Sequence, residues 1–387
     1  MKITAFKNYN LTVFSLGLGL IFFGYNAAEQ HFTAFYQSFG KGELAFQSLA
    51  ILYSAIFIGN LIGPGIIRRL GIKRSIILGF ATYSALVFGI TLKIPNLVYL
   101  LSLLLGLGAG IGGIARVEFL RLISPQNKRG EFAGAIESVR TFGGFLGVLS
   151  VSFILKVFSI SNVFLLLGTV MLFGTFFLLF LNKIGTTEST EESKNFKLMA
   201  KMTVTPKVLL LLPSGVSAGF LLGLVLGFVP VLITKNFGIG WVGIITSLFH
   251  LTLAIALILA GYLSDIKWKF GLIYASMIIS ISAVLIILKF TSLPALALVM
   301  VLLGLGASLG KGAFTAIMLN TFESKIKEAS AVLGNLGLVF GIVPAFLLTN
   351  ILKTTQLSYL AIAITVLGIV CLCIFQVKYY NRNPTHH

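Results

Sequence analysis

LLLGLGAGIGGIARVEFLRLISPQNKRGEFAGAIESVRTFGGFLG, the stretch from Leu103 to Gly147, recurs in this chain. It consists of a glycine-rich apolar run, a short basic turn and a second apolar run. A constant shift, as from Gly106 to Gly304, aligns it with LLGLGASLGKGAFTAIMLNTFESKIKEASAVLGNLGLVFG, Leu302 to Gly341. The residues that recur under this shift are Gly106, Gly108, Gly112, Ala115, Phe142 and Gly143, which become Gly304, Gly306, Gly310, Ala313, Phe340 and Gly341. A single shift across both runs and their connection indicates that the chain is two copies of one half.

The composition around this repeat is that of a membrane protein. Hydrophobic residues make up 57% of the chain and charged residues only 10%, whereas a soluble domain carries about 25% charged residues. The formal net charge of +18 does not indicate a nucleic-acid partner, because the basic residues stand singly between apolar runs instead of forming an arm or stripe.

Twelve apolar segments are each long enough to cross about 30 Å of hydrocarbon. We expect them at 10–36, 43–67, 74–93, 96–123, 131–157, 161–182, 206–234, 241–264, 270–290, 294–321, 329–352 and 356–378. The predicted fold class is therefore an all-α membrane protein with twelve transmembrane helices in two six-helix bundles. The predicted domains are a bundle over 1–182, a polar cytoplasmic linker over 183–205 and a second bundle over 206–387.

The distribution of the 29 lysines and arginines predicts the topology. Alternate connections, beginning with the N-terminal segment, are rich in basic residues, and the connections between them hold one lysine each. The positive-inside rule then places both termini and the linker in the cytoplasm. We expect a multi-pass monomer in the lipid bilayer of the cell membrane.

The first apolar segment contains polar residues on one helical face. Asn26, Glu29 or Gln30, and Thr33 follow helical spacing, and Tyr25 lies one turn before Glu29. A carboxylate in hydrocarbon is costly unless it faces a cavity or a partner. Glu29 either lines a central cavity or lies near the outer headgroups and reaches toward them.

The repeated stretch carries two pairs of opposite charges. Arg116 and Glu118 lie in span four, and Glu137 and Arg140 lie at similar depth in span five. Opposite charges at one depth are expected to neutralise one another. They form either a fixed ion-pair cluster that tightens helix packing or a titrating network that rearranges during function.

The second half has fewer charges. Lys311 takes the place of Gly113 near the middle of span ten, where it needs an anionic partner or the loss of its proton. Asn335 takes the place of Glu137. His250, in span eight, is either a packed core histidine or a titrating group.

Two cytoplasmic loops carry a family resemblance. Between spans two and three the chain reads GPGIIRRLGIKR from Gly63 to Arg74, and between spans eight and nine it reads GYLSDIKWK from Gly261 to Lys269. With twelve spans and two repeats, these loops resemble the signature of the major facilitator superfamily. The resemblance implies gate residues that latch the two halves, namely Arg68, Arg69, Gly71, Gly261 and Asp265. The first loop departs from the signature because it has no aspartate.

A narrower resemblance covers about the first 120 residues. Tyr25-Asn26 with Gln30, Leu52-Tyr53 and the loop RRLGIKRSIILG are similar to the "uncoordinated" ion-channel regulator branch of that superfamily. This branch includes trafficking partners of immune receptors as well as transporters. The resemblance therefore leaves two kinds of function open.

The first hypothesis is a secondary active transporter that moves a small solute by alternating access of two bundles. Parallel repeats of this size are typical of such transporters. Coupling to protons needs a titrating group in a cavity, and the candidates are Glu29, Glu118, Glu137 and His250. Arg140 and Lys311 favour a solute with an anionic group.

The alternative is a protein with a transporter fold that binds or escorts other membrane proteins. An escort has no need of charges inside a cavity, so the buried charges favour transport. No phosphate-binding loop G-x-x-x-x-G-K-[ST] is present, which argues against coupling to ATP. We expect no enzymatic activity, no cofactor and no metal site.

Overall fold

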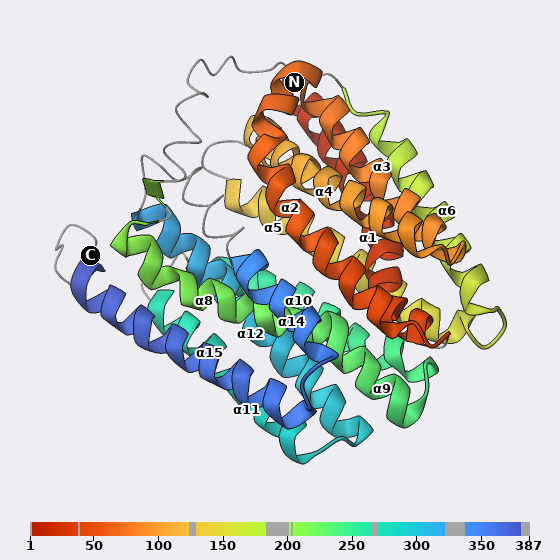
Figure 1. Cartoon of the computed structure of the whole chain (residues 1–387). Helices are drawn as coiled ribbons and strands as arrows, with labels where there is room; N and C mark the ends of the chain where they lie inside the picture. Colours follow the sequence, from red (N-terminus) through yellow and green to blue (C-terminus); the bar gives the residue numbers. More distant parts are fainter. Residues whose placement is uncertain are drawn as a thin grey trace. The chain divides into compact units, whose positions relative to one another are not determined.

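The computed structural model describes residues 2–37, 39–123, 129–182, 201–202, 204–264, 269–321 and 337–380 (Figure 1). Within these ranges the regular structure is entirely helical, which confirms the all-α class. The described chain separates into two compact units. Unit 1 comprises Met1–Thr190 with Pro230–Ala254, and unit 2 comprises Glu191–Val229 with Ile255–His387. The domain boundaries predicted at 182 and 206 stay predictions.

Unit 1 contains the first six membrane helices and one segment of the second sequence half. The helices are α1 Lys2–Gln37, α2 Gly42–Leu70, α3 Ile72–Thr91, α4 Pro95–Ile123, α5 Arg129–Ile154 and α6 Ile160–Leu178, joined by most of α9 Val229–Phe237 and the first part of α10 Gly240–Ser264.

Unit 2 contains the remaining helices. They are α8 Pro206–Gly223, the π-helical turn η2 Leu224–Phe228, α11 Lys269–Lys289, α12 Leu293–Thr321, the π-helical turn η4 Leu338–Ile342, α14 Val343–Thr349, α15 Thr354–Phe375 and the π-helical turn η5 Gln376–Tyr380.

The helix positions agree with the twelve predicted spans. Ten helical segments of the described residues are long and apolar enough to cross a membrane, and Val339–Thr349 is a shorter apolar helix. Helix α5 lies where the fifth span is expected. Most of the linker 183–205 lies outside the described residues, and the orientation of the termini stays a prediction.

Glycines bring α2 and α4 close together, as the glycine-rich stretch predicts. A Cβ atom on Gly110 would lie 2.6 Å from the backbone nitrogen of Asn60 and from the carbonyl oxygen of Ile56. A Cβ atom on Gly106 would meet the carbonyl oxygen of Leu52 and the side chain of Ala55. Only glycine permits this approach, so these residues set the register of α2 against α4.

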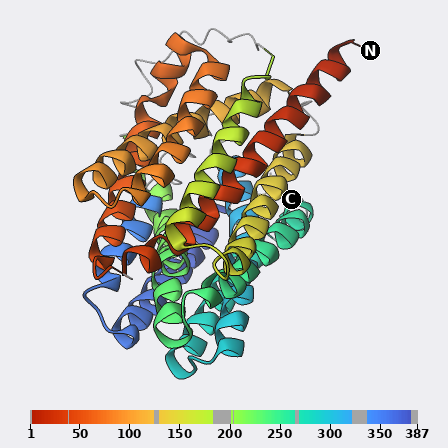
Figure 2. The ribbon, with the colours of Figure 1, turned by 90° about the vertical axis from the view of Figure 1, so that its right-hand side faces the viewer.

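Helix α1 packs along α5 and α6 by the same means (Figure 2, α1 red, α5 gold, α6 yellow-green). Gly143 and Gly147 of α5 face the backbone of Gly19 and Phe23. On another side, Gly24 faces Met171 of α6. These contacts fix the rotation of α1 and therefore the direction of its polar side chains.

Prolines follow the π-helical turns of spans seven and eleven. Pro230 comes two residues after η2 and Pro344 two residues after η4. A proline ring clashes with the carbonyl group four residues earlier and offers no N–H group. The wider π-turn accommodates this local change in the hydrogen-bond ladder.

Candidate functional site

Glu29 lies at the centre of a polar cluster inside unit 1. Its side chain is buried, with 6% of the residue exposed. Tyr25, one turn earlier on α1, donates a hydrogen bond of 2.9 Å to Oε1 of Glu29. Tyr53 of α2 donates a bond of 2.8 Å to the same oxygen. This geometry favours an internal role for Glu29 over a position at the headgroups.

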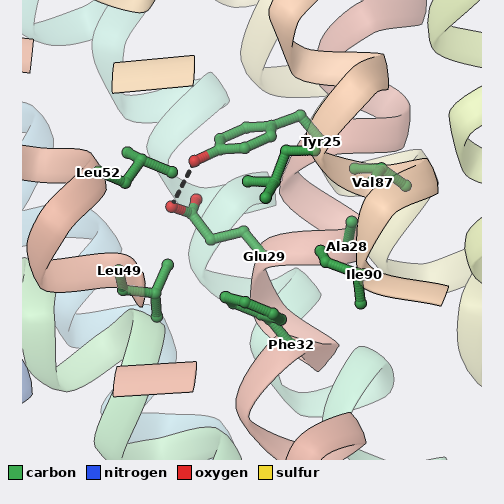
Figure 3. A pocket seen from close by; sticks show the side chains of 9 residues that line it. Tyr25, Ala28, Glu29, Phe32, Leu49, Leu52, Val87 and Ile90 are labelled. Atoms are coloured by element: carbon green, nitrogen blue, oxygen red, sulfur yellow. Dashed lines mark hydrogen bonds between the residues drawn. The ribbon is translucent and has the colours of Figure 1, made fainter. Parts of the chain in front are cut away.

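A small pocket adjoins this carboxyl group (Figure 3). The volume that the centre of a water molecule can occupy in this pocket is about 10 Å³. This is close to the smallest volume that holds one water molecule. Among the described residues, no hydrogen-bond donor meets Oε2 of Glu29. The residues that line the pocket are mostly apolar: Tyr25, Ala28, Glu29, Phe32, Leu49, Leu52, Leu86, Val87 and Ile90.

Aromatic rings surround the hydroxyl groups that hold Glu29. Tyr83 of α3 contacts Tyr25 edge to face, with ring centroids 4.7 Å apart. Phe22 of α1 lies 6.2 Å from Tyr25 and 5.7 Å from Tyr83, centroid to centroid. These three rings are buried, so the hydroxyl group of Tyr25 lies in apolar, aromatic surroundings.

An ion-pair cluster occupies the neighbouring region of α4 and α5. Glu137 accepts a hydrogen bond from Arg116 through Oε1. Through Oε2 it accepts a hydrogen bond of 2.9 Å from Nε of Arg140, and Nη2 of Arg140 lies 2.9 Å from the same oxygen as an ion pair. The three side chains are 16–23% exposed. One carboxylate thus binds two arginines, and the expected grouping of Arg116, Glu137 and Arg140 is present.

Arg140 connects this cluster with the surroundings of Glu29. Its guanidinium group lies over the ring of Phe22, 4.6 Å from the ring centroid. It is also within electrostatic range of Glu29 and of His250 on α10. The site therefore joins residues from α1, α2, α3, α4, α5 and α10.

Three further predicted positions are buried beside this site. The side-chain amide of Asn26 lies against Gly144 of α5. Both polar atoms of the Gln30 amide are fully buried, and no described residue bonds to them. Nε2 of His250 likewise has no hydrogen-bond partner in the described parts of the chain. Such groups are costly to leave unpaired, so they are places where water or a solute would bind.

The other predicted residues lie in unit 2, elsewhere on α4 or outside the described residues. Lys311 is exposed on α12 in unit 2. Glu118 lies on α4, two positions after Arg116. Asn335 and Asp265 fall outside the described residues.

The gate loop of unit 1 is described. Arg68 and Arg69 are exposed in the last turn of α2, and Gly71 follows with φ of 81°. Gly261 lies in the last turn of α10. A contact that the sequence did not indicate comes from Lys73, whose Nζ donates a 2.7 Å bond to the carbonyl oxygen of Leu179, just after α6. A cation at a helix C-terminus is stabilising.

Sequence reasoning did not assign Tyr53, Tyr83 and Phe22 to the site. Each lies in a predominantly apolar helix, and none carries a charge that marks it as a site residue. The available signal was a phenol inside a predicted span, since a buried hydroxyl group usually has a partner.

The site offers proton and solute chemistry. No group of three or more potential metal ligands occurs in the residues that the structure describes. Its polar groups include a carboxyl group beside a water-sized space, two buried amides and two arginines that share the carboxylate of Glu137. Such an arrangement can bind and release a proton, and it can bind a solute by hydrogen bonds.

Comparisons with known proteins agree with this architecture. No curated protein matches the sequence. A crystal structure of the nucleoside transporter NupG has a TM-score of 0.70 at 14% identity, with 95% of this chain and 100% of that chain covered. A bacterial homolog of the human lysosomal transporter Spinster, in an inward-facing and unoccupied conformation, has a TM-score of 0.69 at 13% identity, with 96% of each chain covered. At such identities these matches show the fold alone.

A family model gives the assignment. The model described as Major Facilitator Superfamily matches residues 9–346, which is most of the 387-residue chain. The narrower resemblance to one branch stays a prediction. The protein belongs to the Major Facilitator Superfamily, a family of membrane transporters.

Proposed function

We propose that the protein is a proton-coupled secondary transporter that moves a small solute by alternating access, with Glu29 as the carboxyl group that carries the coupling proton. The observation that carries the proposal is the setting of Glu29. Two tyrosine hydroxyl groups donate to one oxygen, and the residue lines a water-sized space in an apolar pocket. Among the described residues no basic side chain bonds to this carboxyl group.

This setting lets the carboxyl group change its charge during the cycle. The tyrosine donors support the charged form, whereas burial among apolar residues supports the neutral form. Entry of water during opening shifts this balance. A proton affinity that depends on the gate couples proton movement to the conformational change, because each equilibrium biases the other.

The charge of the solute is less constrained than the sequence indicates. Arg140 alone would favour an anionic group, but it shares Glu137 with Arg116. These three side chains leave one net positive charge instead of two, so they favour an anionic group less than two unpaired arginines would, and hydrogen bonding by Asn26 and Gln30 becomes more important. Nucleosides belong in a test panel because NupG, which shares the fold, is a nucleoside transporter. Amino acids, sugars and organic anions complete the test panel.

We expect Glu29→Gln to abolish uphill solute transport driven by a pH gradient while solute exchange continues. Glutamine keeps the shape and hydrogen bonds of a protonated glutamate but cannot release a proton. The purified protein is reconstituted in liposomes that contain a pH-sensitive dye. The panel is then screened for solutes that cause proton flux.

The control is Glu43→Gln, since Glu43 is another acid of unit 1, in the first turn of α2. It should leave both activities unchanged. Gradient-driven accumulation at normal rates in Glu29→Gln would show that the proton binds elsewhere. If no solute in the panel moves at all, the escort function becomes the better interpretation.

A further inference from the structure

We infer that Phe22 is a positioning residue that keeps the guanidinium group of Arg140 on Glu137 and away from Glu29. The inference deepens the proposed function and rests on it, because it names the side chain that lets Glu29 hold its proton.

Three contacts hold Arg140 beside Glu137 and Phe22. Its Nε and Nη2 atoms each lie 2.9 Å from Oε2 of Glu137. Its guanidinium carbon lies 4.6 Å from the centroid of the Phe22 ring. A cation on a ring face is attracted by the π-electrons, and the attraction grows when water is excluded. Phe22 is buried and the Arg140 side chain is 20% exposed, so water is largely excluded from this contact.

Phe22 also contacts the residues around Glu29. It lies seven positions, or about two helical turns, before Glu29, so the two share a face of α1. Its ring meets Tyr25, which donates to Glu29, and Tyr83. The ring therefore contacts both the arginine and Tyr25, one of the two residues that bind the carboxyl group.

The charged and titratable groups near Glu29 come from each neighbouring helix. Tyr25 of α1 and Tyr53 of α2 bond to it, and Tyr83 of α3 lies behind them. Arg140 of α5 is the basic residue within its electrostatic range, and His250 of α10 is near Arg140. A direct bond from Arg140 would hold Glu29 as a carboxylate and end its use as a proton carrier.

The second arginine makes a transfer of Arg140 feasible. If Arg140 leaves Glu137, Arg116 still bonds to Oε1 of that carboxylate. Glu137 is therefore not left as an unpaired charge. When the Phe22 ring turns aside, Arg140 reaches Glu29, and the Glu29 proton passes to water in the opening pocket. The carboxyl O–H bond breaks, and the new ion pair replaces it.

The test uses dicyclohexylcarbodiimide, an apolar reagent that reacts with protonated carboxyl groups in apolar surroundings. Labelling of Glu29 in the purified full-length protein is measured by mass spectrometry. We expect Phe22→Leu to reduce labelling several-fold, because leucine has no ring face to hold Arg140. Phe22→Tyr keeps the ring face and should restore labelling. Phe22→Leu combined with Arg140→Leu should restore it as well, because no arginine then reaches Glu29.

Phe14→Leu is the matched control. Phe14 is a fully buried phenylalanine of the same helix that packs against Phe119, so its replacement should leave labelling unchanged. Phe22→Met repeats the test if Phe22→Leu does not fold. Equal labelling in the folded Phe22→Leu or Phe22→Met variant and the parent would overturn the inference. Reduced labelling in Phe14→Leu would do so too, since it would indicate a general loosening of α1. If Glu29 of the parent does not react, the proposed function itself fails.

Discussion

At the scale of single residues, the site shows how a carboxyl group can remain inside a membrane helix bundle. Glu29 and Glu137 are both surrounded by apolar helices, yet they are stabilised differently. Glu29 is bonded by two neutral hydroxyl groups, whereas Glu137 is bonded by two arginines. The first arrangement permits a change of charge, and the second opposes it. The two glutamates are therefore suited to different tasks.

We expect Glu137→Gln to destabilise the protein more than Arg140→Leu does. The first change leaves two arginines without their carboxylate, and breaking a buried pair costs about 3–5 kcal/mol. Because these side chains are 16–23% exposed, the lower end of that range applies. The second change leaves the pair between Arg116 and Glu137 intact. Thermal unfolding of the purified variants measures the difference, and equal melting temperatures would show that Arg116 and Arg140 do not share Glu137 in the folded protein.

At the scale of elements, glycine contacts determine which faces of the helices meet. Helices α2 and α4 approach so closely that Gly110 faces backbone atoms of α2. This contact fixes the position of α2 along α4, and with it the position of Tyr53. The hydrogen bond from Tyr53 to Glu29 therefore depends on the contact between α2 and α4 at Gly110, outside the site.

Gly110→Ala and Gly113→Ala test this dependence within one helix. A Cβ atom on Gly110 would lie 2.6 Å from two backbone atoms of α2, whereas a Cβ atom on Gly113 meets nothing within 4 Å. We expect Gly110→Ala to cost about 1–3 kcal/mol, as overpacking does. Gly113→Ala should be neutral or stabilising by up to about 1 kcal/mol, since alanine favours the helix. Chemical or thermal denaturation gives the free energy of unfolding of both variants. Similar values for the two variants would contradict the close contact between α2 and α4 at Gly110.

At the scale of the whole molecule, the duplication organises the chain, yet the two copies have diverged in charge. Glu137 corresponds to Asn335 and Gly113 to Lys311. The described polar cluster lies in unit 1, together with a part of α10 from the second copy. The first copy thus supplies most of the candidate proton site.

The basic connections predict that both termini face the cytoplasm. A reporter domain that fluoresces only when it folds in the cytoplasm should therefore be bright at either terminus. A matched fusion in the connection around Lys93, expected on the opposite side, should be dark. A dark C-terminal fusion with a bright N-terminal one would require an odd number of spans.

The sequence alone determined the helical class, the twelve spans, the duplication and the family resemblance, and the site residues Glu29, Glu137, Arg116 and Arg140 could be selected from it. These properties depend on the length and polarity of short segments, because a run of about 20 apolar residues enters hydrocarbon whatever its neighbours are. A charge inside such a run is conspicuous for the same reason.

Only the tertiary structure decided which partners these residues have. Tyr53, Tyr83 and Phe22 meet the site because glycine contacts set the rotation and register of α1, α2 and α4. Linear spacing gives the faces of one helix, but it does not give the angle at which two helices meet. The double pairing of Glu137 and the contact of Arg140 with the Phe22 ring follow from that packing.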